Sequence, residues 1–238
     1  MAARAESDER LFDEATWPAL RRAVEELSWL LERGYSATSA VKLVGDRHGL
    51  NARQRKGVVR CSCPDEALAG RRRRRVPLAA VRGRVVALDG FNCLITLETA
   101  LDGRLVLLGR DGCARDLASI HGAYRRGRRT MEAIDIVGEM LARLGACSVI
   151  WLLDRPVSHS GELQAALQQR AAERGWPWQA IVEDNPDVVL ARPERAGGWV
   201  VATSDSWVLD RCETWCDLVG EILRSDLRQG WVVDLGKG

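Results

Sequence analysis

The chain has 238 residues, of which 46% are hydrophobic and 29% are charged, and these values exclude fibrous and intrinsically disordered classes. Residues 1–84 hold 18 Lys and Arg against 11 Asp and Glu, a net of +7, whereas the remaining residues hold 17 against 22, a net of −5. A basic front and an acidic back suit a polyanionic substrate, with phosphates held by the first part and cations by the second. No apolar run approaches the roughly 18 residues of a membrane span, so we expect a cytoplasmic protein without a membrane partner.

Seven cysteines occur at spacings that match no paired zinc pattern. Buried, reduced thiols are the favoured interpretation. A zinc site drawing on Cys61, Cys63 and His48 is the less favoured alternative, because the two-residue spacing that closes a chelate is missing.

Residues 1–68 are expected to form a small helical module. Apolar residues at helical spacing predict a helix over Trp17–Arg33, ended by Gly34. A second helix is expected from Ser36 or Thr38 to about Gly49, and a third, rich in Arg and Lys, over Asn51–Cys61. This outline is typical of a helix-turn-helix, although Arg55 falls where that motif favours an apolar residue. A plain helical RNA-binding or interaction module is the alternative.

Residues 69–83 are predicted to be a basic linker, because the helical period is lost between Pro64 and Arg84. This stretch contains five consecutive arginines, which are Arg71, Arg72, Arg73, Arg74 and Arg75. Such runs are usually solvated charge; the functional interpretation, which we favour here, is a sequence-independent phosphate clamp. The basic loop His121–Arg129 offers a second phosphate contact through Arg125, Arg126, Arg128 and Arg129.

Residues 84–238 alternate strand and helix patterns, which predicts an α/β fold with a Rossmann-like, mostly parallel sheet covered by helices. Strands are expected at 84–89, 104–108, 148–153, 178–182, 199–204 and 231–235. Helices are expected at 94–101, 113–120 and 130–144, from the loop 155–161 to 174, from 187 to 190, through 207–209, and at 218–227.

Four aspartates follow predicted strands directly or begin a helix that follows one: Asp89, Asp154, Asp187 and Asp205. Groups at the carboxyl ends of parallel strands converge on one crevice. Carboxylate oxygens are the ligands that Mg²⁺ or Mn²⁺ prefers, and such a cation activates water for attack on phosphorus. The alternative is that each aspartate caps a helix.

The residues Asp89-x-x-Asn92, Asn185-Pro186-Asp187-Val188 and Thr203-Ser204-Asp205-Ser206 resemble the PIN and NYN superfamily of metal-dependent ribonucleases. More narrowly, the chain resembles an uncharacterised two-part family that joins a small helical module to a PIN-like domain. The resemblance implies a Mg²⁺ or Mn²⁺ site and cleavage that leaves a 5′-phosphate and a 3′-hydroxyl. It matches Asp89, Asp187 and Asp205 to the family acids, with Asp154 as a further acid.

The resemblance also assigns Asn92 to orient Asp89 or a metal-bound water. One position departs from the pattern: Trp207 stands where many NYN relatives carry a second acid.

The expected function is therefore a metal-dependent nuclease, with an endoribonuclease favoured and RNA preferred over DNA as partner. The alternative is a catalytically inactive nucleic-acid-binding adaptor with a PIN-like scaffold. A haloacid-dehalogenase-type phosphatase is set aside, because it needs a second aspartate at Phe91. No GxGxxG or Walker motif is present. The sequence leaves homo-oligomerisation open.

Overall fold

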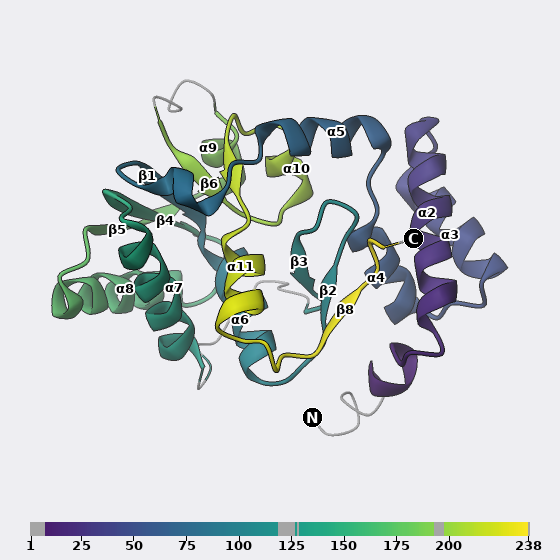
Figure 1. The fold of residues 1–238 in the computed structure, drawn as a ribbon, viewed down its shortest axis with the longest axis horizontal. Coiled ribbons are helices and arrows are strands. Elements are labelled where there is room, and N and C mark those ends of the chain that lie inside the picture. Colours follow the sequence, from purple (N-terminus) through teal and green to yellow (C-terminus); the bar gives the residue numbers. More distant parts are fainter. Residues whose placement is uncertain (1–7, 119–126, 128, 193–197, 238) are drawn as a thin grey trace. The chain divides into compact units, whose positions relative to one another are not determined.

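The structure, a computed structural model, describes residues 8–118, 127, 129–192 and 198–237 (Figure 1). The chain divides into two compact units. Unit 1 comprises Met1–Arg73, Gly103–Leu117 and Gln229–Gly238, and unit 2 comprises Arg74–Asp102 and Ala118–Arg228. The predicted division into residues 1–68, 69–83 and 84–238 therefore differs from the units, because two later stretches of the chain belong to unit 1.

Unit 1 begins with the helices α2 (Trp17–Glu32), α3 (Ala37–Arg47) and α4 (Ala52–Cys61), which confirm the three predicted helices. Two of their starts are fixed by side chains. The Ser36 hydroxyl accepts a hydrogen bond from Ser39 N at the start of α3, and Asn51 and Gln54 form a reciprocal capping box at the start of α4.

The predicted basic linker is instead partly helical, because α5 spans Asp65–Arg74. Its first turn carries Asp65 and Glu66 and its C-terminal end carries arginines, so both ends complement the helix dipole. The apolar period that would have revealed this helix is absent, since arginines occupy most of its second half.

A three-stranded sheet completes unit 1, in the order β3 (Ala114–Asp116), β2 (Val106–Leu108), β8 (Val232–Asp234). Strands β2 and β3 are antiparallel, and β2 and β8 are parallel. The helix predicted over 113–120 is wrong for its described part, because β2 and β3 form a hairpin whose connection runs from Gly109 to Cys113 and includes Asp111-Gly112. Gly112 has a φ of 78°, and Asp-Gly is a strong hairpin signal.

One hydrophobic core joins the three segments of unit 1. The helices contribute residues such as Leu20, Leu27 and Val58, all fully buried. The strands and their flanks contribute Leu105, Leu107, Leu117, Val233 and Leu235 to the same cluster. The N-terminal helices therefore share their core with residues more than 200 positions later, as the hydrogen bond from Arg21 Nε to Asp234 O also shows.

Unit 2 contains a five-stranded sheet in the order β5-β4-β1-β6-β7, with every neighbouring pair parallel. The strands are β1 (Val85–Asp89), β4 (Ser148–Asp154), β5 (Trp178–Glu183), β6 (Val200–Ala202) and β7 (Trp215–Cys216). This α/β architecture with flanking helices confirms the predicted Rossmann-like fold class. Strand β7 was not predicted; it has two residues, too short for a sequence pattern.

The helices of unit 2 are η1 (Leu78–Val81), α6 (Gly90–Leu101), α7 (Thr130–Leu144), α8 (Ser160–Arg174), α9 (Pro186–Leu190), α10 (Ser206–Leu209) and α11 (Leu218–Ser225). Helix α6 starts directly after Asp89 rather than at Leu94. A Cβ on Gly90 would lie 2.7 Å from Leu152 O, so glycine is required where the chain leaves β1.

Among the described residues, none of the helices combines the length and apolarity that a membrane span requires.

Candidate carboxylate site

The candidate site lies where the order of the parallel sheet reverses. From β1 the chain adds β4 and then β5 on one side, and afterwards β6 and β7 on the other. The switch point is therefore between β1 and β6. In open α/β sheets, ligands bind outside the carboxyl ends of the strands at this point.

Asp89 ends β1 at the switch point and is 5% exposed. It does not cap helix α6. Instead its Oδ2 accepts a hydrogen bond of 2.7 Å from Thr203 Oγ1, which follows β6. Burial raises the pKa of Asp89 to about 8, and the hydrogen bond opposes this rise. The buried carboxylate is thus held by a hydroxyl from the strand across the switch point.

The other three aspartates act electrostatically on Asp89. The negative charges of Asp187, Asp205 and Asp154 each raise the pKa of Asp89 further. Burial, followed by the charges of Asp205 and Asp154, raises the pKa of Asp187 to about 6. Burial also raises the pKa of Asp154. The predicted convergence of the four acids on one cation therefore stays a prediction, which the electrostatic influence of the other three on Asp89 supports.

Asp205 is a helix cap as well as a member of this group. Its Oδ1 accepts hydrogen bonds from Trp207 N at 2.8 Å and from Val208 N at 3.0 Å at the start of α10. Asp187 lies in the first turn of α9, whose cap is Asn185. The capping alternative thus holds for Asp205, whereas Asp89 and Asp187 have no such role.

The amide of Asn92 has a different partner from the one expected. Its Oδ1 accepts hydrogen bonds from Ser204 N at 2.9 Å and Ser204 Oγ at 3.0 Å. Asn92 therefore ties helix α6 to the loop after β6, and Thr203 rather than Asn92 orients Asp89.

The four aspartates offer carboxylate oxygens, which are the ligands that hard divalent cations prefer. None of the ion pairs between described residues includes these four aspartates. Within the same described part of the chain, no three His, Cys, Asp or Glu side chains are grouped closely enough to hold an ion. Mg²⁺ commonly binds through one or two carboxylates, with waters and substrate phosphates completing its shell. A cation there would be held by Asp89 with one neighbouring carboxylate, Asp187 or the second oxygen of Asp205, and by waters and substrate phosphates.

The arginine run does not act as one clamp. Arg71 is 3% exposed and pairs with Asp111 in unit 1, Arg74 donates to Leu209 O, and Arg75 pairs with Asp217. Only Arg72 and Arg73 are exposed without a recorded partner among the described residues. The prediction that all five arginines bind phosphates is wrong for Arg71, because its guanidinium is buried and forms an ion pair with Asp111.

The other predicted phosphate contacts are also largely engaged or undescribed. Arg125, Arg126 and Arg128 lie outside the described residues. Arg129 pairs with Glu132 and Asp102.

The basic helix α4 is likewise engaged with its own unit. Arg53 pairs with Asp8, Arg60 pairs with Asp116, and Lys56 donates to Leu117 O. Arg55 pairs with Asp46 and donates to Leu50 O. In a helix-turn-helix, this helix would enter a groove of the nucleic acid. Here its basic side chains form intramolecular contacts instead.

The cysteines are all free thiols, and only Cys147 is exposed. His48 contacts Glu26 at 3.0 Å. Among the described residues, Cys61, Cys63 and His48 are not grouped closely enough to hold a zinc ion, so the zinc alternative finds no support.

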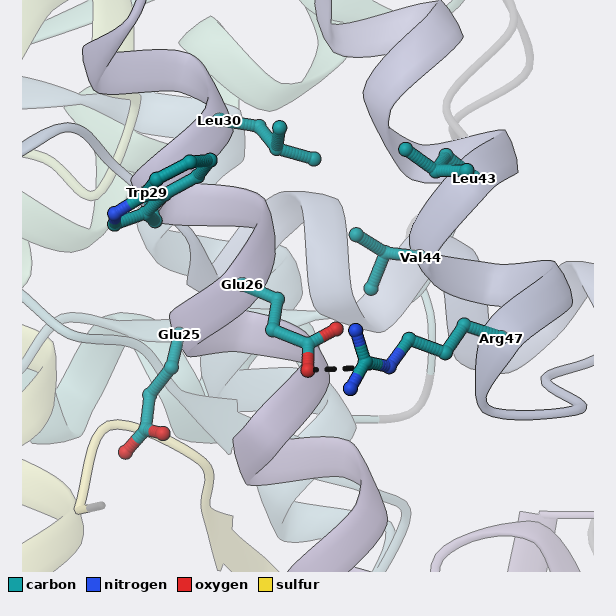
Figure 2. A pocket seen from close by; sticks show the side chains of 7 residues that line it. All are labelled: Glu25, Glu26, Trp29, Leu30, Leu43, Val44 and Arg47. Atoms are coloured by element: carbon teal, nitrogen blue, oxygen red, sulfur yellow. Dashed lines mark ion pairs between the residues drawn. The ribbon is translucent and has the colours of Figure 1, made fainter.

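A separate hollow of about 560 Å³ lies in unit 1 between α2 and α3 (Figure 2). Figure 2 shows Trp29 and Leu30 on one wall and Leu43 and Val44 on the other, with Glu26 paired to Arg47. None of the predicted site residues lines it. Its lining combines four apolar side chains with Glu25, Glu26 and Arg47, and Glu26 is paired with Arg47.

Sequence reasoning missed the roles of Thr203 and Ser204. Both are buried polar residues, 6% and 7% exposed, directly after β6. Adjacent hydroxyl residues at the end of an otherwise apolar strand were the available signal, since buried hydroxyls need partners.

A family model described as "Domain of unknown function (DUF5616)" matches residues 78–221, which include all four aspartates. A second, described as "Protein of unknown function (DUF434)", matches residues 19–74. The chain is also similar to "Uncharacterized protein MJ0935" of Methanocaldococcus jannaschii, with 28% identity over 207 residues that cover 86% of this chain and 97% of that protein. No solved structure matches the chain.

Proposed function

The chain belongs to the DUF5616 family, and from its carboxylate site we propose that it is a Mg²⁺- or Mn²⁺-dependent nuclease that hydrolyses phosphodiester bonds, with RNA as the favoured substrate. The observation that carries the proposal is the buried carboxylate of Asp89 at the switch point of the sheet, which the charges of Asp187, Asp205 and Asp154 act on and which has no arginine or lysine partner among the described residues. Such repulsion is costly unless a cation is normally bound.

A bound divalent cation would lower the pKa of a coordinated water and offset the charge that develops on the leaving oxygen. Hydrogen bonds within the chain hold two of the carboxylates in fixed orientations. Thr203 fixes the orientation of Asp89, and the capping bonds of Asp205 fix the orientation of its carboxylate. A bound cation would lower the raised pKa of Asp89, so that its carboxylate carries charge at neutral pH, where Asp187 with a pKa of about 6 is already mostly ionised.

The test is incubation of the purified protein with end-labelled single-stranded and hairpin RNA in Mn²⁺, Mg²⁺ or EDTA. We expect cleavage with either metal, products with a 5′-phosphate and a 3′-hydroxyl, and none in EDTA. The variant D187N keeps the side-chain shape but removes a charge and should lower cleavage by at least about 10²-fold. Absence of cleavage by the unmodified protein in every metal would refute the proposal.

A nucleic-acid-binding adaptor without catalysis is the second candidate. It is favoured by one observation: Oδ1 of Asp205 is occupied by capping, and Trp207 follows at the position where many NYN relatives carry an acid. Calorimetric titration with Mn²⁺ separates the two, because an adaptor should show no binding that D89N or D187N removes.

A further inference from the structure

A tryptophan beside the carboxylates is unusually exposed for so large an apolar side chain. Trp207 is 42% exposed and stands two residues after Asp205. Its backbone is fixed, because Trp207 N donates to Asp205 Oδ1 and the next two residues, Val208 and Leu209, are fully buried. Helix α10 packs against α9, the helix that carries Asp187. The indole is thus presented from an anchored turn next to two of the four acids.

A guanidinium accompanies this indole. The Arg211 side chain lies over the ring with Cζ 4.3 Å from the centroid, and its Nη1 donates to Trp207 O at 3.1 Å. Arg211 is exposed and forms no ion pair with a carboxylate among the described residues. An aromatic face and an uncompensated positive charge are therefore held together at the edge of a negatively charged site.

We propose that Trp207 and Arg211 form a platform on which one base of a single-stranded nucleic acid stacks, with Arg211 facing the adjoining phosphate. Base stacking on aromatic side chains is tolerant of sequence, and it requires an unpaired base, so the platform selects single strands over duplexes. This inference rests on the proposed function, which it deepens by naming the substrate class. It also gives a physical role to the tryptophan that replaces an acid.

The chain contains a matched control. Trp29 on α2 is 55% exposed, Arg33 Cζ lies 3.5 Å from its ring centroid, and Arg33 Nη1 donates to Trp29 O at 3.1 Å. The two pairs have the same residue types at the same spacing, but Trp29 belongs to unit 1 and has none of the four aspartates near it in the chain. Nonspecific binding of nucleic acid to an exposed tryptophan would be lost equally when either tryptophan is replaced.

The test measures binding of a fluorescein-labelled single-stranded oligoribonucleotide, the same strand in a duplex, and the same strand with abasic sites, all in EDTA. We expect W207A to weaken single-strand binding by about tenfold, W207F to retain most of it, and W29A to leave it unchanged. The unmodified protein should prefer the strand with bases to the abasic strand. R211Q should reduce the slope of log affinity against log salt by about one.

Equal binding by W207A and the unmodified protein, equal losses in W207A and W29A, preference for the duplex, or no single-strand binding would each overturn the platform. Binding in EDTA does not depend on cleavage. A protein that binds through Trp207 but does not cleave would uphold the platform and refute the nuclease. Cleavage by the unmodified protein together with unchanged binding by W207A would uphold the nuclease and refute the platform.

Discussion

At the scale of single residues, the carboxylate of Asp89 is costly to keep in a metal-free protein. Its surroundings raise its pKa from an ordinary value of 3.8 to about 8, so the folded protein retains a proton that the unfolded chain releases. When the folded state binds more protons than the unfolded state, stability falls as pH rises. The loss of stability caused by Asp89 therefore grows between about pH 4 and pH 8 and is constant above pH 8.

We predict that D89N removes this dependence. In EDTA, the variant should be about as stable as the unmodified protein near pH 4, and more stable by a few kcal/mol at pH 8. Urea unfolding at several pH values measures this difference. Saturating Mn²⁺ should reverse the order, because the cation stabilises only the protein that retains the carboxylate. Parallel pH profiles for the two proteins would show that Asp89 is ionised at little cost.

The position of the four aspartates at or after the carboxyl ends of parallel strands could be predicted from the sequence, because each follows an apolar run typical of a buried strand. The partners of those aspartates could not. Whether Thr203 or Asn92 faces Asp89 depends on the register of β1 against β6, in which Leu88 lies opposite Ala202 and so brings Thr203 level with Asp89. Register is a property of the folded sheet, and a strand of three residues does not reveal it.

At the scale of elements, the sequence predicted helices with an apolar stripe and missed those without one. Helix α7 was predicted with its observed bounds, since Ile134, Val137 and Leu141 recur at helical spacing and are buried. Helix α5 has few apolar residues, and its arginines were taken for a linker. The hairpin of β2 and β3 lies where the sequence predicts a helix over 113–120, because β3 has only three residues and shows too little of an alternating pattern.

The arginines of helix α5 differ in their surroundings: Arg71 is buried and paired with Asp111, whereas Arg72 and Arg73 are exposed and could contact phosphates. Burial raises the pKa of Asp111, but the guanidiniums of Arg115 and Arg71 more than reverse this and hold it well below the usual range. R71Q should therefore destabilise the protein by about 1–3 kcal/mol and leave nucleic-acid affinity unchanged.

The double variant R72Q/R73Q should do the opposite. Stability should change by less than about 0.5 kcal/mol, because both side chains are exposed. Affinity for single-stranded RNA should fall, with a salt slope shallower by roughly 1–2. Anisotropy titrations over a salt series and urea unfolding measure the two effects. An unchanged salt slope would show that the run only serves the fold.

At the scale of the whole molecule, the chain passes between its two units four times. The predicted helical module, residues 1–68, therefore lacks part of its own core. Leu105, Leu107, Leu117, Val233 and Leu235 all come from later segments. Each fully buried aliphatic side chain contributes about 1.5–3 kcal/mol of burial free energy, so their loss is comparable with the stability of a small domain.

We predict that a fragment of residues 1–83 does not fold cooperatively, although it contains α2, α3, α4 and α5. Its circular dichroism should show partial helix and a broad thermal transition. As a milder control in the full chain, L235A should keep a cooperative transition and lower the free energy of unfolding by about 2–5 kcal/mol. A sharp transition of the fragment near that of the full chain would show that the helices are autonomous.

The late position of strand β8 also has a consequence for how the protein is made. On the ribosome, α2, α3 and α4 emerge first, but the strand that completes their core is among the final ten residues of unit 1. The part of their apolar faces that β8 covers stays exposed while about 170 further residues are translated, which at about 5–20 residues per second takes on the order of ten seconds. A chain that lacks Val232–Asp234 would therefore leave part of the core of its first helices exposed to water throughout its life, not only during synthesis.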